Sequence, residues 1–137
     1  MKEIEIPLEI VGQIMSHVQS VDGEEVCGFL SSRNGDEFGF YPIRNKAADP
    51  SRLFHMDEKE QITAMKNMRE KDEKLFAIYH SHPTSAAVPS ITDIREATYP
   101  EALYLIVSLS TVGVLEMRAY YLIGEMGEEI AVKATEN

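Results

Sequence analysis

One stretch of the sequence constrains both the fold and the chemistry: an apolar segment that ends in two histidines. Residues 75–79 read Leu-Phe-Ala-Ile-Tyr, and His80-Ser81-His82-Pro83 follows directly. The length and composition of this segment predict a buried strand over residues 75–82. Side chains at positions i and i+2 of a strand project from the same face. His80 and His82 can therefore be directed at one point in space.

A carboxylate, Asp93, lies eleven residues beyond the second histidine. Two imidazoles and a carboxylate, with one position left for water, form the ligand set of a catalytic zinc ion. We therefore predict that His80, His82 and Asp93 bind one zinc ion carrying a water molecule. Ser90-x-x-Asp93 also has the pattern of a helix capping box, which would hold Asp93 rigidly. The Ser90 hydroxyl suits an N-cap alone, and it also suits donation to an oxyanion.

Hydrolysis at such a site needs a general base that takes a proton from the metal-bound water. Glu24 and Glu25 are both candidates, because they precede a strand that can lie beside the histidine strand. Periodicity alone leaves both open. Cys27 adds a formal alternative, a Cys–His nucleophile, since it would share a strand face with Glu25. Free cysteine is among the most buried residue types, so we expect a small apolar role instead.

The rest of the chain interleaves helical and strand patterns. The predicted helices are residues 7–20, residues 58–72, and a short helix that Ser90 opens. Strands are predicted at 25–32, 37–43, 102–109, 115–122 and 129–133, with Asn34-Gly35 as a hairpin turn and 102–109 as a central buried strand. This order predicts an α/β or α+β protein with a mixed sheet.

The composition of the chain limits the classes of partner that are expected. At 137 residues, with 44% hydrophobic residues, the sequence predicts one packed domain over residues 1–137. A net charge of −10 and scattered Lys and Arg argue against nucleic acid, which needs a basic cluster. No apolar run approaches the about 20 residues of a membrane helix, so no membrane partner is expected. The lone cysteine excludes an internal disulfide and, without a signal-peptide pattern, predicts a cytoplasmic location.

Together these motifs resemble the JAMM (MPN-plus) metalloprotease signature. That signature is a glutamate, a distant His-Ser/Thr-His-Pro, and Ser-x-x-Asp with seven residues between the second histidine and the serine. The matching segments here are Glu25-x-Cys27-Gly28-x-Leu30, His80-Ser81-His82-Pro83 and Ser90-x-x-Asp93, with residues 83–89 giving the spacing. Arg44-Asn45 through Gln61 is similar to the middle of the small bacterial and archaeal members, and the likeness extends over about residues 7–122.

The resemblance implies a cytidine-deaminase-like α/β sandwich, in which helices pack against a curved mixed β-sheet. It assigns the base to Glu25 rather than Glu24, and the oxyanion contact to Ser90. By the same comparison, the zinc ligands are His80, His82 and Asp93.

The resemblance also implies a substrate. Members hydrolyse peptide or isopeptide bonds after the C-terminal glycines of ubiquitin-like proteins, and some small prokaryotic members act on sulfur carriers. We therefore expect a zinc metalloprotease or isopeptidase that cuts after the Gly-Gly tail of such a partner. The alternative is an MPN-type module that binds these tails without cutting them, or a self-inhibited enzyme. Related domains often pair, so a homodimer is compatible with the resemblance.

Overall fold

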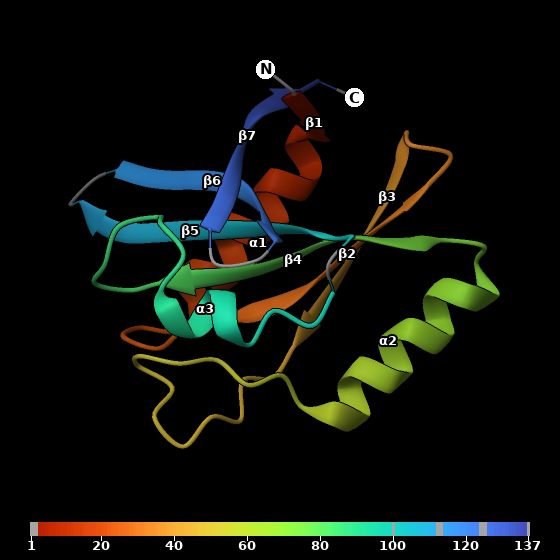
Figure 1. The fold of residues 1–137 in the computed structure, drawn as a ribbon. Helices are drawn as coiled ribbons and strands as arrows, with labels where there is room; N and C mark the ends of the chain where they lie inside the picture. Colours follow the sequence, from red (N-terminus) through yellow and green to blue (C-terminus); the bar gives the residue numbers. More distant parts are fainter. Residues whose placement is uncertain (1–2, 100, 112–113, 124–125, 137) are drawn as a thin grey trace.

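A curled seven-stranded mixed sheet in the order β1-β7-β6-β5-β4-β2-β3 forms the framework of the protein (Figure 1). The computed structural model describes residues 3–99, 101–111, 114–123 and 126–136. The pairs β1–β7 and β4–β5 are parallel, and the other neighbours are antiparallel. The strands are β1 (Glu3–Pro7), β2 (Cys27–Arg33), β3 (Glu37–Ile43), β4 (Lys74–His82), β5 (Leu103–Thr111), β6 (Val114–Ile123) and β7 (Met126–Thr135); the helices are α1 (Leu8–Ser20), α2 (Glu58–Glu70) and α3 (Ile91–Arg95).

Alternation along β4 divides the core into two layers. Ala77 and Tyr79 lie in the cluster that α1 packs against. Ile78 lies in the cluster on the other face, which α2 covers. His80 and His82 continue the alternation of Ile78, because successive side chains of a strand point to opposite faces. The two histidines therefore lie on the α2 side of the sheet, as their i, i+2 spacing predicts.

The parallel pairing of β4 with β5 brings the carboxyl ends of both strands to one edge of the sheet, where His82 pairs with Ser108. Both arrows point toward this edge, on the left of Figure 1. Residues 103–107 of β5 are all buried, so the prediction of a central buried strand is confirmed. Helices on both faces of a curled mixed sheet confirm the predicted fold class.

Several boundaries differ from the sequence prediction. The strand β1 was not predicted; it pairs in parallel with β7, a partner distant in the sequence. Pro7 ends β1 and is the N-cap of α1, so the helix begins at Leu8 rather than at Pro7. Glu25 and Val26 precede β2, which begins at Cys27. The strand predicted at 129–133 is part of the longer β7.

Turn chemistry follows the sequence more closely. Asn34 and Gly35 adopt φ values of 56° and 77°, the left-handed pair that a type I′ hairpin needs. None of the helices in the described part of the chain has the length and apolar character of a membrane span.

Candidate metal centre

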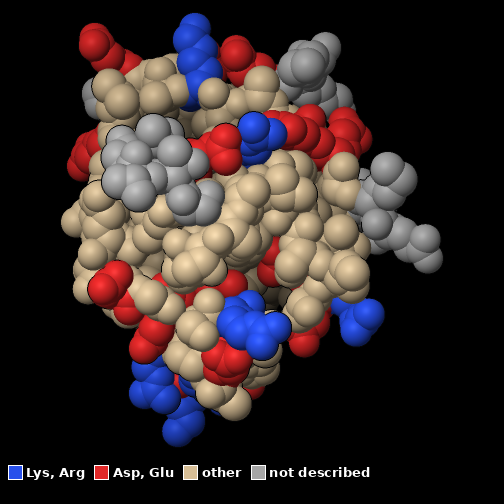
Figure 2. Space-filling model, turned by 90° about the vertical axis from the view of Figure 1, so that its left-hand side faces the viewer, with Lys and Arg blue, Asp and Glu red and all other residues tan. Residues whose placement is uncertain are grey.

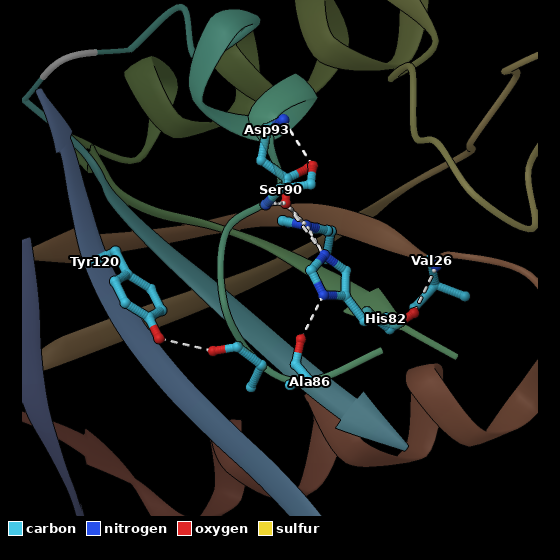
Figure 3. Close-up of polar contacts among 9 residues, drawn as sticks. Val26, His82, Ala86, Ser90, Asp93 and Tyr120 are labelled. Atoms are coloured by element: carbon cyan, nitrogen blue, oxygen red, sulfur yellow. Dashed lines mark hydrogen bonds and ion pairs between the residues drawn. The ribbon is translucent and has the colours of Figure 1, made fainter. Parts of the chain in front are cut away.

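Three electron-pair donors meet at the carboxyl end of β4. The Nε2 atoms of His80 and His82 lie 3.1 Å apart, and the Oδ2 atom of Asp93 lies 3.2 Å from the first and 3.1 Å from the second. The structure thus brings together the three side chains that the sequence predicts as ligands. In Figure 3, Asp93 reaches from α3 toward the ring of His82.

The capping box of α3 fixes the position of Asp93. The main-chain N–H of Asp93 donates to Ser90 Oγ at 2.9 Å, and the main-chain N–H of Ser90 donates to Asp93 Oδ2 at 2.9 Å. Both halves of the predicted box are therefore present. Ser90 Oγ acts as an acceptor here, so its hydroxyl proton stays available for a second partner.

The loop after β4 fixes the tautomer of His82. Its Nδ1 atom lies 2.8 Å from the carbonyl oxygen of Ala86, drawn in Figure 3. A carbonyl only accepts, so Nδ1 carries the proton and donates. In the neutral ring, the lone pair of Nε2 is then directed at Asp93 and His80, which is the orientation a metal ligand needs.

His80 is held by packing. Its side chain is fully buried, and the Phe54 ring stacks on it with centroids 4.3 Å apart and planes 23° apart. Burial lowers the pKa of His80, which favours the neutral ring. In the metal-free protein burial opposes ionisation of Asp93, but the His80 and His82 rings, when they carry a proton on Nε2, outweigh it by hydrogen bonding and hold the pKa of the carboxyl well below its usual range.

The donor set fits a zinc ion. Ligand atoms about 2.0–2.1 Å from a tetrahedral zinc ion lie about 3.3 Å apart, close to the three edges measured here. Two neutral imidazoles and a carboxylate also match zinc in ligand type. In the neutral rings, two nitrogen lone pairs and a carboxylate oxygen point at one another and repel. A cation bound between the three donors would offset this repulsion.

Of the two candidate bases, Glu25 is buried beside this centre and Glu24 is exposed to solvent. Glu25 is only 6% exposed. Val26 and Ser81 exchange two hydrogen bonds, of 2.9 Å to the Ser81 hydroxyl and 3.0 Å between main chains, which join this segment to the end of β4. Burial raises the pKa of Glu25 to about 7, with the His82 charge lowering it and the Asp93 charge raising it. Its Oε1 atom is buried and has no hydrogen-bond partner among the described residues.

A cavity of about 470 Å³ borders the centre on the α2 side. Asp93 and the Phe54 ring, which stacks on His80, line the side of the cavity nearest the metal centre. Ile78, Tyr99 and Tyr104 contribute apolar walls. A band of uncharged side chains crosses the middle of the molecular face at this edge of the sheet, and charged side chains, acidic ones among them, border the recess below it (Figure 2).

Cys27 does not contribute a nucleophile to this arrangement. It is fully buried, and its Sγ donates to the Ile43 carbonyl oxygen at 3.4 Å. Burial raises the pKa of the thiol to about 12, with the Glu25 and Glu60 charges adding to the effect. A thiol of that pKa is not ionised near neutral pH, so the expected apolar role agrees with the structure.

Sequence reasoning gave no role to two residues that shape the site. Phe54 covers the His80 ring, and the Ser81 hydroxyl accepts from Val26. Neither contact follows from periodicity, because each joins segments far apart in the sequence. Phe54 lies within residues 44–61, which resemble the middle of other small family members. That resemblance was the one feature of the sequence that pointed to Phe54.

The comparisons with known proteins agree with this geometry. A family model described as prokaryotic homologues of the JAB domain matches residues 7–122. CysO-cysteine peptidase of Mycobacterium tuberculosis is 32% identical over 127 residues, which cover 90% of this chain and 86% of that protein. Desampylase of Haloferax volcanii is 34% identical over 86 residues, covering 61% of this chain and 62% of that protein.

A solved structure is similar over nearly the whole length. The solution structure of a protein from Desulfitobacterium hafniense superposes with a TM-score of 0.86 at 30% identity, covering 98% of this chain and 94% of that one. With a family match over residues 7–122 and a donor set at the expected positions, the chain belongs to the prokaryotic JAB-domain family, a small member of the JAMM/MPN group.

Proposed function

We propose that the protein is a zinc-dependent peptidase or isopeptidase that cuts after the C-terminal Gly-Gly of a ubiquitin-like or sulfur-carrier protein. The observation that carries the proposal is the triangle of His80, His82 and Asp93 donors, with the buried carboxylate of Glu25 beside it. Relatives named as a CysO-cysteine peptidase and a desampylase support a hydrolase.

In this proposal His80, His82 and Asp93 hold the ion, which when bound supplies a water of lowered pKa and a Lewis acid for the scissile carbonyl. Glu25 accepts the proton of the attacking water on its carboxylate and then donates it to the leaving nitrogen. Burial raises the pKa of Glu25 in the metal-free protein, and the nearby cation favours its ionised form, so the carboxylate can accept the proton at neutral pH. Ser90 donates its free hydroxyl proton to the carbonyl oxygen as negative charge develops there.

The proposed substrate is an extended tail. Phe54 on one side and the loop of residues 83–89 on the other confine the donors, so glycines next to the scissile bond suit the approach. The cavity of about 470 Å³ has room for apolar side chains upstream of the glycines. The band of uncharged side chains across this face suits a tail without strong charge (Figure 2).

The proposal includes a cytoplasmic location, a chain that folds as one domain over residues 1–137, and substrate recognition without nucleic acid or membrane. The buried thiol of Cys27 is consistent with a reducing compartment. A homodimer stays a prediction.

The test combines metal analysis with a cleavage assay. We expect one zinc ion per chain, and release of the extension from host sulfur-carrier proteins that carry a residue or peptide after Gly-Gly. A chelator should stop release, and added zinc should restore it. The same carrier with Ala-Ala in place of Gly-Gly is the matched substrate control, and Glu25→Gln is the matched protein control. Full zinc occupancy with binding but no cleavage of any carrier would favour the non-cutting module instead.

A further inference from the structure

One amide side chain outside the candidate site uses its entire hydrogen-bonding capacity. The Nδ2 atom of Asn45 donates to the carbonyl oxygens of Glu25 and Leu53, at 2.9 Å each. Its Oδ1 atom accepts from the main-chain N–H of Ala47 at 3.0 Å and of His55 at 2.9 Å. An asparagine has two N–H donors and two acceptor lone pairs, so no capacity is left over.

The first of these bonds acts on the proposed base. Glu25 precedes β2, so the β2 ladder does not hold its main chain. Its N–H instead donates to the Pro50 carbonyl at 2.7 Å, and its carbonyl accepts from Asn45. Both main-chain polar groups of Glu25 are therefore held by the loop of residues 44–56.

The other bonds act on the ring that covers a proposed ligand. Asn45 binds the carbonyl of Leu53 and the N–H of His55, the two peptide groups on either side of Phe54. The Phe54 ring stacks on His80 at 4.3 Å. One amide thus connects the main chain that carries Glu25 to the main chain that carries the aromatic cover of His80.

We propose that Asn45 is a positioning residue that fixes Glu25 relative to the metal centre by joining it to the Phe54 segment. The expected loss of activity rests on the proposed function. The expected loosening of the Glu25 main chain rests on the hydrogen bonds alone. Loops are the more mobile parts of a protein, and a displacement of about 1 Å near the chemistry can lower a rate by about 100-fold. Only a side chain with two donors and two acceptors can close all four contacts, so aspartate and alanine cannot replace Asn45.

Two variants separate the contributions. Asn45→Asp keeps the acceptor for Ala47 and His55 but removes both donations, and Asn45→Ala removes all four bonds. Ser51→Ala is the control in the same loop, since Ser51 is exposed and its hydroxyl donates only to Asp49 among the described side chains. Asn67→Asp, on the exposed side of α2, is the control for the same chemical change.

The first measurement is amide hydrogen exchange followed by NMR, in the metal-free and zinc-loaded proteins. We expect the Glu25 amide to exchange at least about tenfold faster in both Asn45 variants, with the amides of β4 and β5 unchanged. The second measurement is cleavage by the zinc-loaded protein. We expect kcat to fall about 10- to 100-fold, KM to change less than about threefold, and zinc to stay at one per chain. Both controls should behave as wild type.

The outcomes are decisive. Unchanged exchange at Glu25, or loss of protection throughout the sheet in both variants, would overturn the positioning role. So would full kcat in Asn45→Ala when the wild type is active. If the wild type cuts no Gly-Gly substrate, the proposed function fails, while the exchange result still supports or overturns the link between Asn45 and Glu25.

Discussion

The Nδ1–H of His82 donates to the main-chain carbonyl of Ala86 at 2.8 Å, so the ring orientation is set by the loop that follows its own strand. The carbonyls of the residues before and after Ala86 also accept hydrogen bonds, and these hold the loop in place. The Ser85 carbonyl accepts from the Ser108 hydroxyl at 2.6 Å. The Ala87 carbonyl accepts from the hydroxyl of Tyr120 at 2.7 Å, the contact that Figure 3 draws at Tyr120. Three consecutive carbonyls thus bind side chains of β4, β5 and β6, and the acceptor for His82 is fixed from both sides.

This arrangement predicts an effect of Tyr120 on metal affinity without any contact to the metal. Tyr120→Phe removes the donor to Ala87, so the loop and the acceptor for His82 become less well fixed. We expect zinc affinity to fall a few-fold, below the about 10- to 100-fold seen for direct partners of metal ligands, and stability to fall by about 1 kcal/mol. Zinc titration against a competing chelator measures the first effect. Tyr121→Phe is the control, and equal affinity in both variants would contradict the role of the loop.

Asp93 should be required for the metal although it is also part of a helix cap. Asp93→Asn keeps a side chain that can accept from Ser90 but removes the charge that faces both histidines. We expect loss of stoichiometric zinc and loss of the thermal stabilisation that zinc gives, which is about 2.7 kcal/mol when zinc exceeds its Kd 100-fold.

The control for Asp93→Asn is Asp57→Asn. Asp57 is the N-cap of α2, where its carboxylate accepts from the Glu60 N–H at 3.0 Å. This variant changes a cap in the same way and should lower stability by no more than about 1 kcal/mol, with zinc retained. Retention of one zinc by Asp93→Asn would remove Asp93 from the ligand set.

Thiol reagents should not inhibit the protein. Cys27 is fully buried, and burial raises the pKa of its thiol to about 12, so little thiolate is present at pH 8. We expect no labelling of the folded, zinc-loaded protein by iodoacetamide within an hour, complete labelling in denaturant, and activity of Cys27→Ala within about threefold of wild type. Rapid labelling of the native protein with parallel loss of activity would point to cysteine chemistry.

Some of the site could be predicted from the sequence because its determinants are local. The period of two along β4 places His80 and His82 on one face, and the Ser90-x-x-Asp93 spacing gives the capping box that orients the carboxylate. The choice between Glu24 and Glu25 could not be made in this way. Both residues precede β2, so strand periodicity does not yet apply to them.

The remaining features depend on contacts between distant segments. The strand β1 forms because β7 offers a parallel edge more than 120 residues later, and its own five residues carry too weak a pattern to indicate it. The loop of residues 44–56 looks irregular in sequence. Main-chain hydrogen bonds such as that from Lys46 to His55 hold it together with the Asn45 side chain, whose partners Glu25 and Leu53 cannot be identified without the fold.

Gly28 should be essential for the fold, whereas Gly12 should not. A Cβ atom at Gly28 would lie 2.5 Å from the Tyr79 ring and 2.6 Å from the Tyr41 carbonyl oxygen, and a main-chain carbonyl cannot move aside cheaply. We expect Gly28→Ala to lower the free energy of unfolding by about 2–4 kcal/mol. Gly12 lies in α1, and apart from its chain neighbours and the adjacent helix backbone no described atom lies within 4 Å of the same position, so Gly12→Ala should raise stability by about 0.5–1 kcal/mol. Urea denaturation of both variants tests the contrast, and a stable Gly28→Ala protein would contradict the close packing of β2 on Tyr79.

The buried carboxylate of Glu25 should make the metal-free protein less stable as the pH rises. Burial raises its pKa from 4.5 in the unfolded chain to about 7 in the folded one. Between these values the folded state binds more protons than the unfolded state, so this contribution to stability is complete below pH 4.5 and is lost as the pH rises through 7. Glu25→Gln removes the titration, and the variant should be more stable than wild type at pH 8 by about 1–2 kcal/mol. A shift of one pKa unit corresponds to about 1.4 kcal/mol, and the expected difference is set lower than that conversion gives because solvent screens the charge.

Urea denaturation from pH 4.5 to 8 in the presence of a chelator measures the difference in stability between the wild type and Glu25→Gln. With zinc bound, the nearby cation favours the carboxylate, so the wild-type curve should become flatter while Glu25→Gln still binds one zinc. A difference between the two metal-free proteins that does not change with pH would mean that Glu25 is solvated in the folded state, and would remove the physical basis for its role as the base.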